Sequence, residues 1–271
     1  MSTKNYWDDR LVRSSNNIGS LIKRSPLTQG LTNMVFSVRS SDEIFIARTL
    51  KRRGIKSVLD VACGLGKTVI PSIAEYTAGV DIVGYPTDIT LGKGYQECVQ
   101  YDAPDYNFEI SRQVDALTCI YLNAHVSFAS YRRIISNSLR FLRPGGVAIL
   151  INEYDNDGIS YNLMRRDRDK FDRLVKWMEH WHFEYEAHFT EKFQAAFSAL
   201  KLIHRKPLIT GLLPALHYYA YYTGHNPSSA FTGPFILADA PLSVMNYMLG
   251  LLSPRFNKCF TVGYVYEYSP Q

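Results

Sequence analysis

Short apolar runs alternate with amphipathic segments through the first part of the chain. Runs of strand length occupy residues 57–61, 77–82, 99–102, 115–121 and 147–151. Apolar spacing, caps and stop signals indicate helices at 41–53, 67–76, 86–98 and 131–142. Strands that alternate with helices are typical of βαβ units. The pattern therefore predicts an α/β fold with a mostly parallel sheet, in which ligands bind at the carboxyl ends of the strands.

The last part of the chain shows a different pattern. Residues 155–188 are highly charged and predict a long helix centred on 161–186, and a shorter helix is expected at 189–199. Strands are expected at 200–203 and 260–266. The aromatic and apolar stretch 208–259 predicts a helical insertion that covers the substrate. Two alternatives stay open for it: a helical pair that covers the sheet, and a contact with a membrane surface.

These patterns divide the chain into two parts. Residues 1–54 predict an N-terminal lid or helical segment, and residues 55–271 the main domain. The chain of 271 residues is 46% hydrophobic and 20% charged, which excludes disorder of the whole chain. A formal charge of +5 is compatible with anionic substrates but does not demand a nucleic-acid partner.

Targeting and cysteine signals are weak. The N-terminus lacks a signal peptide, and no apolar run is long enough for a transmembrane helix. The four cysteines form no CxxC pair, so we expect neither a disulfide framework nor a metal site. A reducing cytoplasm is the expected location.

A glycine-rich turn follows the first predicted strand, with the sequence Asp60-Val61-Ala62-Cys63-Gly64-Leu65-Gly66. Glycine at such a turn allows positive φ and lets a ligand approach the backbone. A P-loop is excluded because Val61 stands where its first glycine is needed, and a dinucleotide fingerprint fails at Val69. A third class of ligand-binding turn has an acidic residue at the end of the strand, followed by a GxG turn. This chain matches that pattern.

Acidic residues recur near the ends of the next strands. Asp81 follows Asp60 by 21 residues, and Asp102 follows Asp81 by 21 more. Asp81 is placed to accept from both ribose hydroxyls of an adenosine. Asp102 is placed to accept from the adenine amine, while the N–H of Ala103 faces the ring. Asp115 opens the fourth strand 13 residues after Asp102. Asp88 is an alternative to Asp81 as the acid that binds the ribose.

Five segments together resemble the class I S-adenosylmethionine-dependent methyltransferases: 58–66, 78–82, 99–103, 115–126 and 142–150. Residues 189–208 and 260–268 resemble the late helix, sixth strand and antiparallel seventh strand of that family. The resemblance implies a Rossmann-like, seven-stranded, mostly parallel sheet with flanking helices. It also implies S-adenosylmethionine as the cofactor.

The same resemblance implies the site residues. The cofactor would be bound by Asp60, Ala62, Cys63, Gly64, Gly66, Asp81, Ile82, Asp102, Ala103, Cys119 and Ile120. His125, after the fourth strand, is the first candidate for a general base, and Glu153, after the fifth, is the second. A structural role is open for both.

The expected activity is methyl transfer to an oxygen of a saccharide, lipid-linked or natural-product acceptor. A non-catalytic scaffold that keeps the donor fold is one alternative. An RNA methyltransferase is another, and it would require a concentrated basic face, whereas the basic residues here are spread along the chain. We expect a small-molecule partner and no specific nucleic acid. A peripheral membrane contact through 208–259 and a homodimer are left open.

Overall fold

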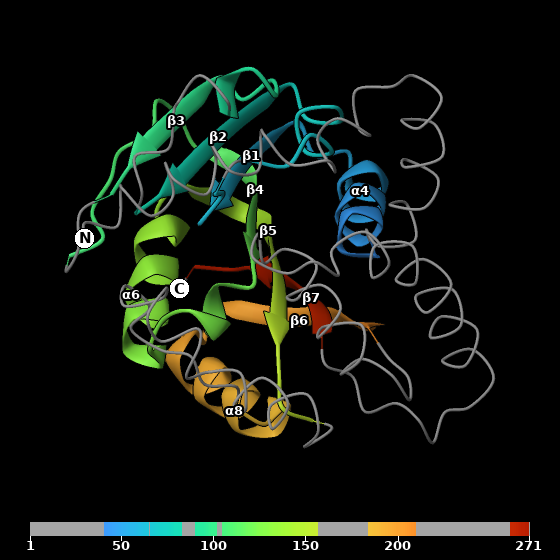
Figure 1. Cartoon of the computed structure of the whole chain (residues 1–271), viewed down its shortest axis with the longest axis vertical. Coiled ribbons are helices and arrows are strands. Elements are labelled where there is room, and N and C mark those ends of the chain that lie inside the picture. The colour runs from blue at the N-terminus through green and yellow to red at the C-terminus, as the bar shows by residue number, and fades with distance from the viewer. Residues whose placement is uncertain are drawn as a thin grey trace, which may run out of the picture. The chain divides into compact units, whose positions relative to one another are not determined.

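A seven-stranded sheet forms the centre of the structure, which is a computed structural model (Figure 1). The structure describes residues 41–64, 66–82, 90–101, 105–156, 184–209 and 261–270. Nearly all of them belong to one compact unit, which draws on 42–154, 178–206 and 261–271.

The strands run in the order β3-β2-β1-β4-β5-β7-β6 across the sheet. Their bounds are β1 Ser57–Val61, β2 Tyr76–Asp81, β3 Glu97–Gln100, β4 Val114–Ile120, β5 Leu142–Glu153, β6 Leu200–Ile209 and β7 Thr261–Tyr268. The first five strands pair in parallel, and β7 pairs antiparallel with β5. The predicted fold class, a mostly parallel seven-stranded sheet with an antiparallel seventh strand, is confirmed. The order reverses between β1 and β4, so a crevice is expected at their carboxyl ends.

Helices cover both faces of this sheet. They are α4 Ser41–Arg53, α6 Phe128–Leu139 and α8 Glu186–Ala196, with a 3₁₀ turn, η1, at Leu122–Ala124. Successive residues of β7 point to opposite faces. A Cβ on Gly263 would lie 2.6 Å from the ring of Phe45 in α4, whereas the ring of Tyr266 lies 5.0 Å from that of Phe193 in α8. Helices α4 and α8 therefore lie on opposite faces, and the missing side chain at Gly263 lets α4 pack closely.

The predicted helix 67–76 is wrong. Residues 68–73 form a series of turns instead, and β2 begins at Tyr76. Pro71 lacks the backbone N–H that a helix needs, and it disfavours helical angles at the preceding Ile70. The β-branched Thr68 and Val69 add to this effect.

Other predicted boundaries also change. The helix expected over 86–98 cannot reach Cys98, because Gly94 adopts a φ of 98° and β3 begins at Glu97. The helix expected over 131–142 ends at Leu139, and β5 begins at Leu142 rather than at 147. Residues 142–146 extend the strand, and Leu142 pairs with Val114 at the start of β4, before a shift in register that ends where Val147 pairs with Ala116. By contrast, the strand 57–61 and the helix 41–53 are confirmed at both ends.

Several expectations fall outside the described residues. These include the lid over residues 1–40, most of the charged helix 155–188, and nearly all of the insertion 208–259. The domain division, the membrane contact and the homodimer stay predictions. Within the part of the chain that the structure describes, no helix is both long enough and apolar enough to cross a membrane.

Candidate functional site

The glycine-rich turn leaves β1 with three residues in left-handed backbone conformation. The φ angles are 54° at Ala62, 55° at Gly64 and 72° at Gly66. Glycine adopts such angles without strain, whereas alanine does not. Gly66 is needed for space as well, because a Cβ there would lie 2.9 Å from the ring of Tyr95. The absence of a side chain at Gly66 therefore lets the ring of Tyr95 pack against the turn.

Asp60 supports this turn from the end of β1. Its side chain is buried, with 2% of the residue exposed, and burial raises the pKa of its carboxyl. One oxygen accepts a hydrogen bond from the hydroxyl of Thr118 (2.7 Å), the residue in register with it on β4. The other accepts from the hydroxyl of Tyr95 (2.6 Å). Both carboxylate oxygens thus have partners within the protein.

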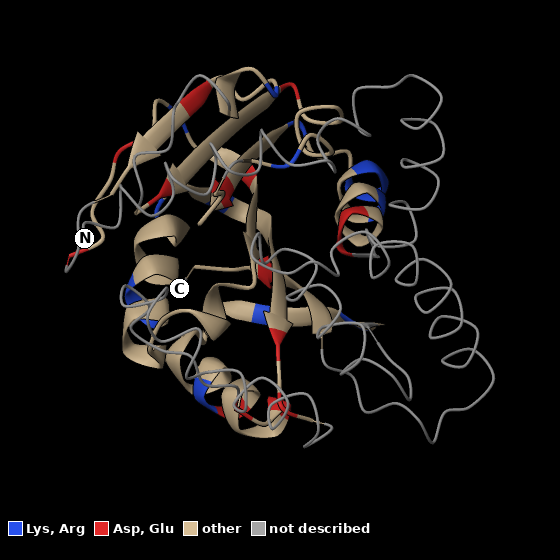
Figure 2. Ribbon diagram, in the orientation of Figure 1, with Lys and Arg blue, Asp and Glu red and all other residues tan. Residues whose placement is uncertain are grey.

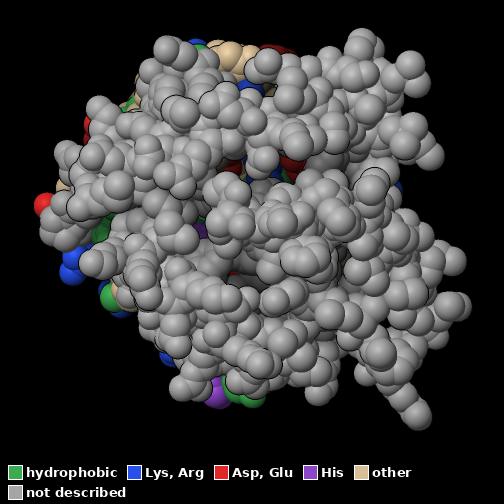
Figure 3. Space-filling view, in the orientation of Figure 1, with side chains coloured by type: hydrophobic (Ala, Val, Ile, Leu, Met, Phe, Trp, Pro, Cys, Tyr) green, Lys and Arg blue, Asp and Glu red, His purple; other side chains and the backbone are tan. Residues whose placement is uncertain are grey.

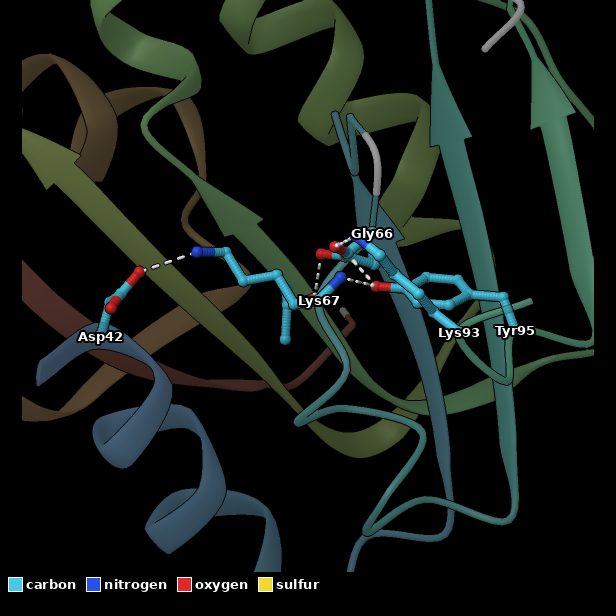
Figure 4. A network of polar contacts seen from close by, with 7 residues as sticks. Asp42, Gly66, Lys67, Lys93 and Tyr95 are labelled. Carbon is cyan, nitrogen blue, oxygen red and sulfur yellow. Dashed lines mark hydrogen bonds and ion pairs between the residues drawn. The ribbon is translucent and has the colours of Figure 1, made fainter. Parts of the chain in front are cut away.

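Tyr95 links Asp60 to the far side of the turn. Its hydroxyl accepts a hydrogen bond from the backbone N–H of Lys67 at 2.9 Å (Figure 4). The ring packs where Cβ atoms on Gly66 and Gly79 would lie. Sequence reasoning missed Tyr95, because it comes from the segment before β3 and no motif spacing connects it to the turn. Thr118 could have been found from the register of β1 with β4.

Two lysines lie beside the turn (Figure 4). Lys93 donates from Nζ to the carbonyl oxygen of Gly66 at 2.9 Å. Lys67 extends to Asp42 in α4, where Nζ lies 2.9 Å from Oδ2. Burial lowers the pKa of Lys67, but the charge and hydrogen bond of Asp42 outweigh it and the net pKa is raised. Burial, followed by the charge of Lys67, lowers the pKa of Lys93. The ammonium of Lys93 therefore lies against the turn, whereas that of Lys67 is directed to Asp42.

Asp81 ends β2 next to the turn. Its Oδ2 accepts a hydrogen bond from the backbone N–H of Gly64 at 2.9 Å. The N–H of Cys63 also donates to the carbonyl of Val80, at 3.1 Å, so the turn is tied to β2 at two points. Asp88, Asp102 and Ala103 lie outside the described residues. The choice of Asp81 over Asp88 for the ribose therefore stays a prediction.

The end of β4 leads into η1 and His125. Tyr121 adopts a φ of 61° where η1 begins, and the N–H of His125 closes η1 by donating to the carbonyl of Leu122 at 3.0 Å. Burial lowers the pKa of His125 to about 4. The imidazole is therefore neutral at physiological pH.

Asn123, within η1, holds the end of β5 beside that of β4. Its Nδ2 donates to the carbonyl of Glu153 (2.7 Å), and its Oδ1 accepts from the N–H of Glu153 (3.1 Å). Glu153 is buried, with 4% exposed. This clamp brings the segments that carry His125 and Glu153 to the same edge of the sheet, a link that sequence reasoning missed.

Asp115 lies at the other edge. It is one residue into β4, at the amino-terminal end, where it accepts hydrogen bonds from the backbone N–H groups of Lys56 and Ser57. The regular spacing of acids therefore does not extend to Asp115, because strand starts and strand ends lie at opposite edges of a parallel sheet.

The sequence comparisons find one partial relative. No protein-family model matches the chain. A dTDP-4-amino-2,3,4,6-tetradeoxy-D-glucose N,N-dimethyltransferase from Saccharopolyspora spinosa is 30% identical over 99 residues, which cover 35% of this chain and 39% of that protein. The match thus spans about two fifths of the length of the relative.

Solved structures resemble the chain over more of its length. The YcgJ protein from Bacillus subtilis has a TM-score of 0.51 and 14% identity, covering 84% of this chain and 98% of that one. The plantazolicin methyltransferase BpumL, solved with a desmethyl plantazolicin analogue and SAH, has a TM-score of 0.51 and 12% identity, covering 98% of both chains. The chain has the class I methyltransferase fold. The resemblance seen in the sequence is confirmed at the level of the fold.

The class I methyltransferase fold places most of the predicted site residues together. Those at or beyond the carboxyl ends of β1, β2, β4 and β5 are Asp60, Ala62, Cys63, Gly64, Gly66, Asp81, Ile82, Cys119, Ile120, His125 and Glu153. Cys119 is buried in β4, in register with Val61. The role of each residue stays a prediction.

Proposed function

We propose that this protein is an S-adenosylmethionine-dependent methyltransferase that acts on a small molecule of the sugar or natural-product class. The observation that carries this proposal is the left-handed turn at the β1–β4 reversal, with the Asp81 carboxylate beside it. S-adenosylmethionine would supply a methyl group already activated by the sulfonium. The protein then has to align the acceptor and exclude water.

The residues at this edge suit the donor. Asp81 would accept from the ribose hydroxyls, as the acid at the end of the second strand does in dinucleotide sites. The exposed backbone of the turn would lie against the methionine part. Lys93, whose ammonium lies at Gly66, would attract its carboxylate, while Asp60 keeps the turn in shape through Tyr95 and Thr118.

The low basicity of His125 and the named activity of the partial relative favour nitrogen as the acceptor atom over the oxygen expected from the sequence. An imidazole with a pKa of about 4 is a weak base for a hydroxyl, whose proton is held far more tightly. A neutral amine is already a nucleophile and needs only orientation. The partial relative from Saccharopolyspora spinosa is named as an N,N-dimethyltransferase of an amino sugar. His125 would then accept a hydrogen bond from the amine and so orient the lone pair of the amine nitrogen toward the methyl group.

Among the described residues, the charge distribution favours a small acceptor over RNA. Acidic and basic residues are interspersed along the described ribbon (Figure 2), and they are mixed where described side chains are visible in the space-filling view (Figure 3). A protein that binds RNA through phosphates would gather its basic residues on one face.

The test is transfer of a labelled methyl group to paired sugar nucleotides that differ only in an amino or a hydroxyl group. We expect methylation of the amino sugar, and loss of donor binding in Asp81→Ala. Glu75→Ala is the matched control, because Glu75 precedes the same strand at its other end and pairs with the exposed Lys56. Equal donor affinity in Asp81→Ala and wild type would remove Asp81 from the site. Transfer to the hydroxyl sugar alone would restore the oxygen acceptor.

A further inference from the structure

Two cysteines meet beneath the glycine-rich turn. Cys63 belongs to the turn and Cys98 to β3, with Gly79 of β2 between them. Cys98 is in register with Gly79 across the parallel β2–β3 pair, so a side chain at either position would leave the sheet on the same face. A Cβ on Gly79 would lie 2.9 Å from the Sγ of Cys63. The sulfur of Cys63 therefore occupies the space beside Cys98 that the absent side chain of Gly79 leaves open.

The two thiols differ in acidity. The thiol of Cys63 donates to the carbonyl oxygen of Gly64 at 3.6 Å. Its proximity lowers the pKa of Cys98, and the proximity of Cys98, followed by burial, raises the pKa of Cys63. The thiolate is the reactive form of cysteine, so we assign the attack on the peroxide to Cys98. Both side chains are half-buried, whereas Cys119 is fully buried in β4.

We propose that Cys63 and Cys98 form a reversible disulfide on exposure to hydrogen peroxide, and that this bond switches off the cofactor site. The Cys98 thiolate attacks one peroxide oxygen, which gives a sulfenic acid at Cys98 and releases hydroxide. The sulfur of Cys63 then attacks the Cys98 sulfur, loses its proton and displaces the sulfenic oxygen as water. In total, two thiols and one peroxide give one disulfide and two waters. A dithiol reductant reverses the change.

The disulfide would deform the turn. A sulfur–sulfur bond is only about 2.0 Å long, so its formation pulls Cys63 toward β3. The N–H of Cys63 donates to Val80, and the next residue, Gly64, donates to Asp81, so both bonds between the turn and β2 move with it. Asp81 then loses the backbone partner that positions its carboxylate. This consequence for the cofactor rests on the proposed function.

The experiment uses the full-length protein, treated with hydrogen peroxide and then digested with trypsin without reduction. Cleavage after lysine and arginine places Cys63 in peptide 57–67 and Cys98 in peptide 94–112. We expect a linked species whose mass is two hydrogens below the sum of the two peptides. In parallel, calorimetry should show the affinity for S-adenosylmethionine falling about tenfold or more, and dithiothreitol should restore it.

Cys98→Ser is the matched variant, since Cys98 lies on β3 and outside the predicted cofactor set. It should bind the donor as the reduced wild type does and show no loss of affinity after peroxide. Cys98→Ala serves the same purpose if the serine variant unfolds at a lower urea concentration.

The outcomes separate the two proposals. Absence of the linked peptide, or a linked peptide with unchanged donor affinity, overturns the switch. A loss of affinity that persists in Cys98→Ser also overturns it, because oxidation then acts elsewhere. If the reduced protein binds no donor, the proposed function fails, whereas the peptide assay still tests the disulfide.

Discussion

The two edges of the sheet carry aspartates of the same kind in opposite environments. Asp60, at the carboxyl end of β1, is buried and accepts hydrogen bonds from two hydroxyl groups, and burial raises the pKa of its carboxyl. Asp115, at the amino-terminal end of β4, is partly exposed. Burial raises the pKa of Asp115 as well, but hydrogen bonds from Ser57 and Lys56, together with the charge of Arg143, outweigh it and the net pKa is lowered.

We propose that this difference separates a structural edge from a functional one. A cavity of about 690 Å³ lies at the amino-terminal edge, bordered by Lys56, Arg112 and Arg143. Two of these cations are already paired: Lys56 with Glu75 at 2.9 Å, and Arg143 with Asp115 at 2.6 Å. The carboxyl edge instead holds strained backbone at Ala62 and Tyr121. Strain maintained by surrounding contacts, rather than cavity size, points to the functional site.

Asp60→Ala should have the largest effect. The substitution leaves the hydroxyls of Tyr95 and Thr118 buried without their acceptor, at a cost of about 2–4 kcal/mol in the free energy of unfolding. Urea unfolding followed by fluorescence measures this change. A loss below about 1 kcal/mol would show that the hydrogen bonds of Asp60 to Tyr95 and Thr118 contribute little to stability.

Asp115→Ala sharpens the comparison at the other edge. It removes an acceptor from two backbone N–H groups and from Arg143, but water can replace it at this partly exposed position. We expect a loss of about 1–2 kcal/mol in urea and an unchanged affinity for S-adenosylmethionine. A weakened affinity would contradict the assignment of this edge to structure.

The two aspartates should also give opposite pH dependences, each measured against its asparagine variant. The unfolded pKa of aspartate is about 4. Because the folded pKa of Asp60 is raised, wild type should lose stability relative to Asp60→Asn as the pH rises above about 4 through that pKa. Because the folded pKa of Asp115 is lowered, its advantage over Asp115→Asn should disappear as the pH falls below about 4. Urea unfolding at a series of pH values gives the sign of each slope, and parallel slopes for the two pairs would contradict the difference in environment.

Ala62→Gly should have the smallest effect and the opposite sign. The left-handed conformation costs alanine about 1–2 kcal/mol, and the entropy of glycine offsets about 0.5–1 of that. We therefore expect stabilisation of about 0.5 kcal/mol, read from the urea midpoint. A destabilised variant would indicate that the methyl group of Ala62 makes contacts worth more than the strain.

The strand and the turn of the site could be predicted from the sequence, whereas the side chains that hydrogen-bond to Asp60 could not. The strand 57–61 and its turn follow from a local apolar run and from glycine chemistry, both of which can be read along the chain. The bonds of Asp60 to Tyr95 and Thr118 span 35 and 58 residues, so no local pattern contains them. Asp115 was grouped with the other acids although it follows Asp102 by only 13 residues and opens its strand, and in a parallel sheet the start of a strand lies at the opposite edge from the strand ends.

The helix predicted from apolar spacing at 67–76 does not form, because Pro71 and a contact with a distant residue favour turns. Residues 67–76 have apolar positions at helical spacing, yet Pro71 breaks the backbone pattern. The backbone N–H of Lys67 then bonds to the Tyr95 hydroxyl instead of lying within a helix. Choosing between these outcomes required knowledge of a residue 28 positions away.

The most direct test of this account is a calorimetric titration of the reduced protein with S-adenosylhomocysteine, comparing wild type, Asp81→Ala and Glu75→Ala. The account predicts binding with a dissociation constant of about 1 μM to 1 mM for wild type and Glu75→Ala. It predicts at least a tenfold weaker interaction for Asp81→Ala. Absence of binding heat in wild type at several temperatures, or equal affinity in all three proteins, would contradict it.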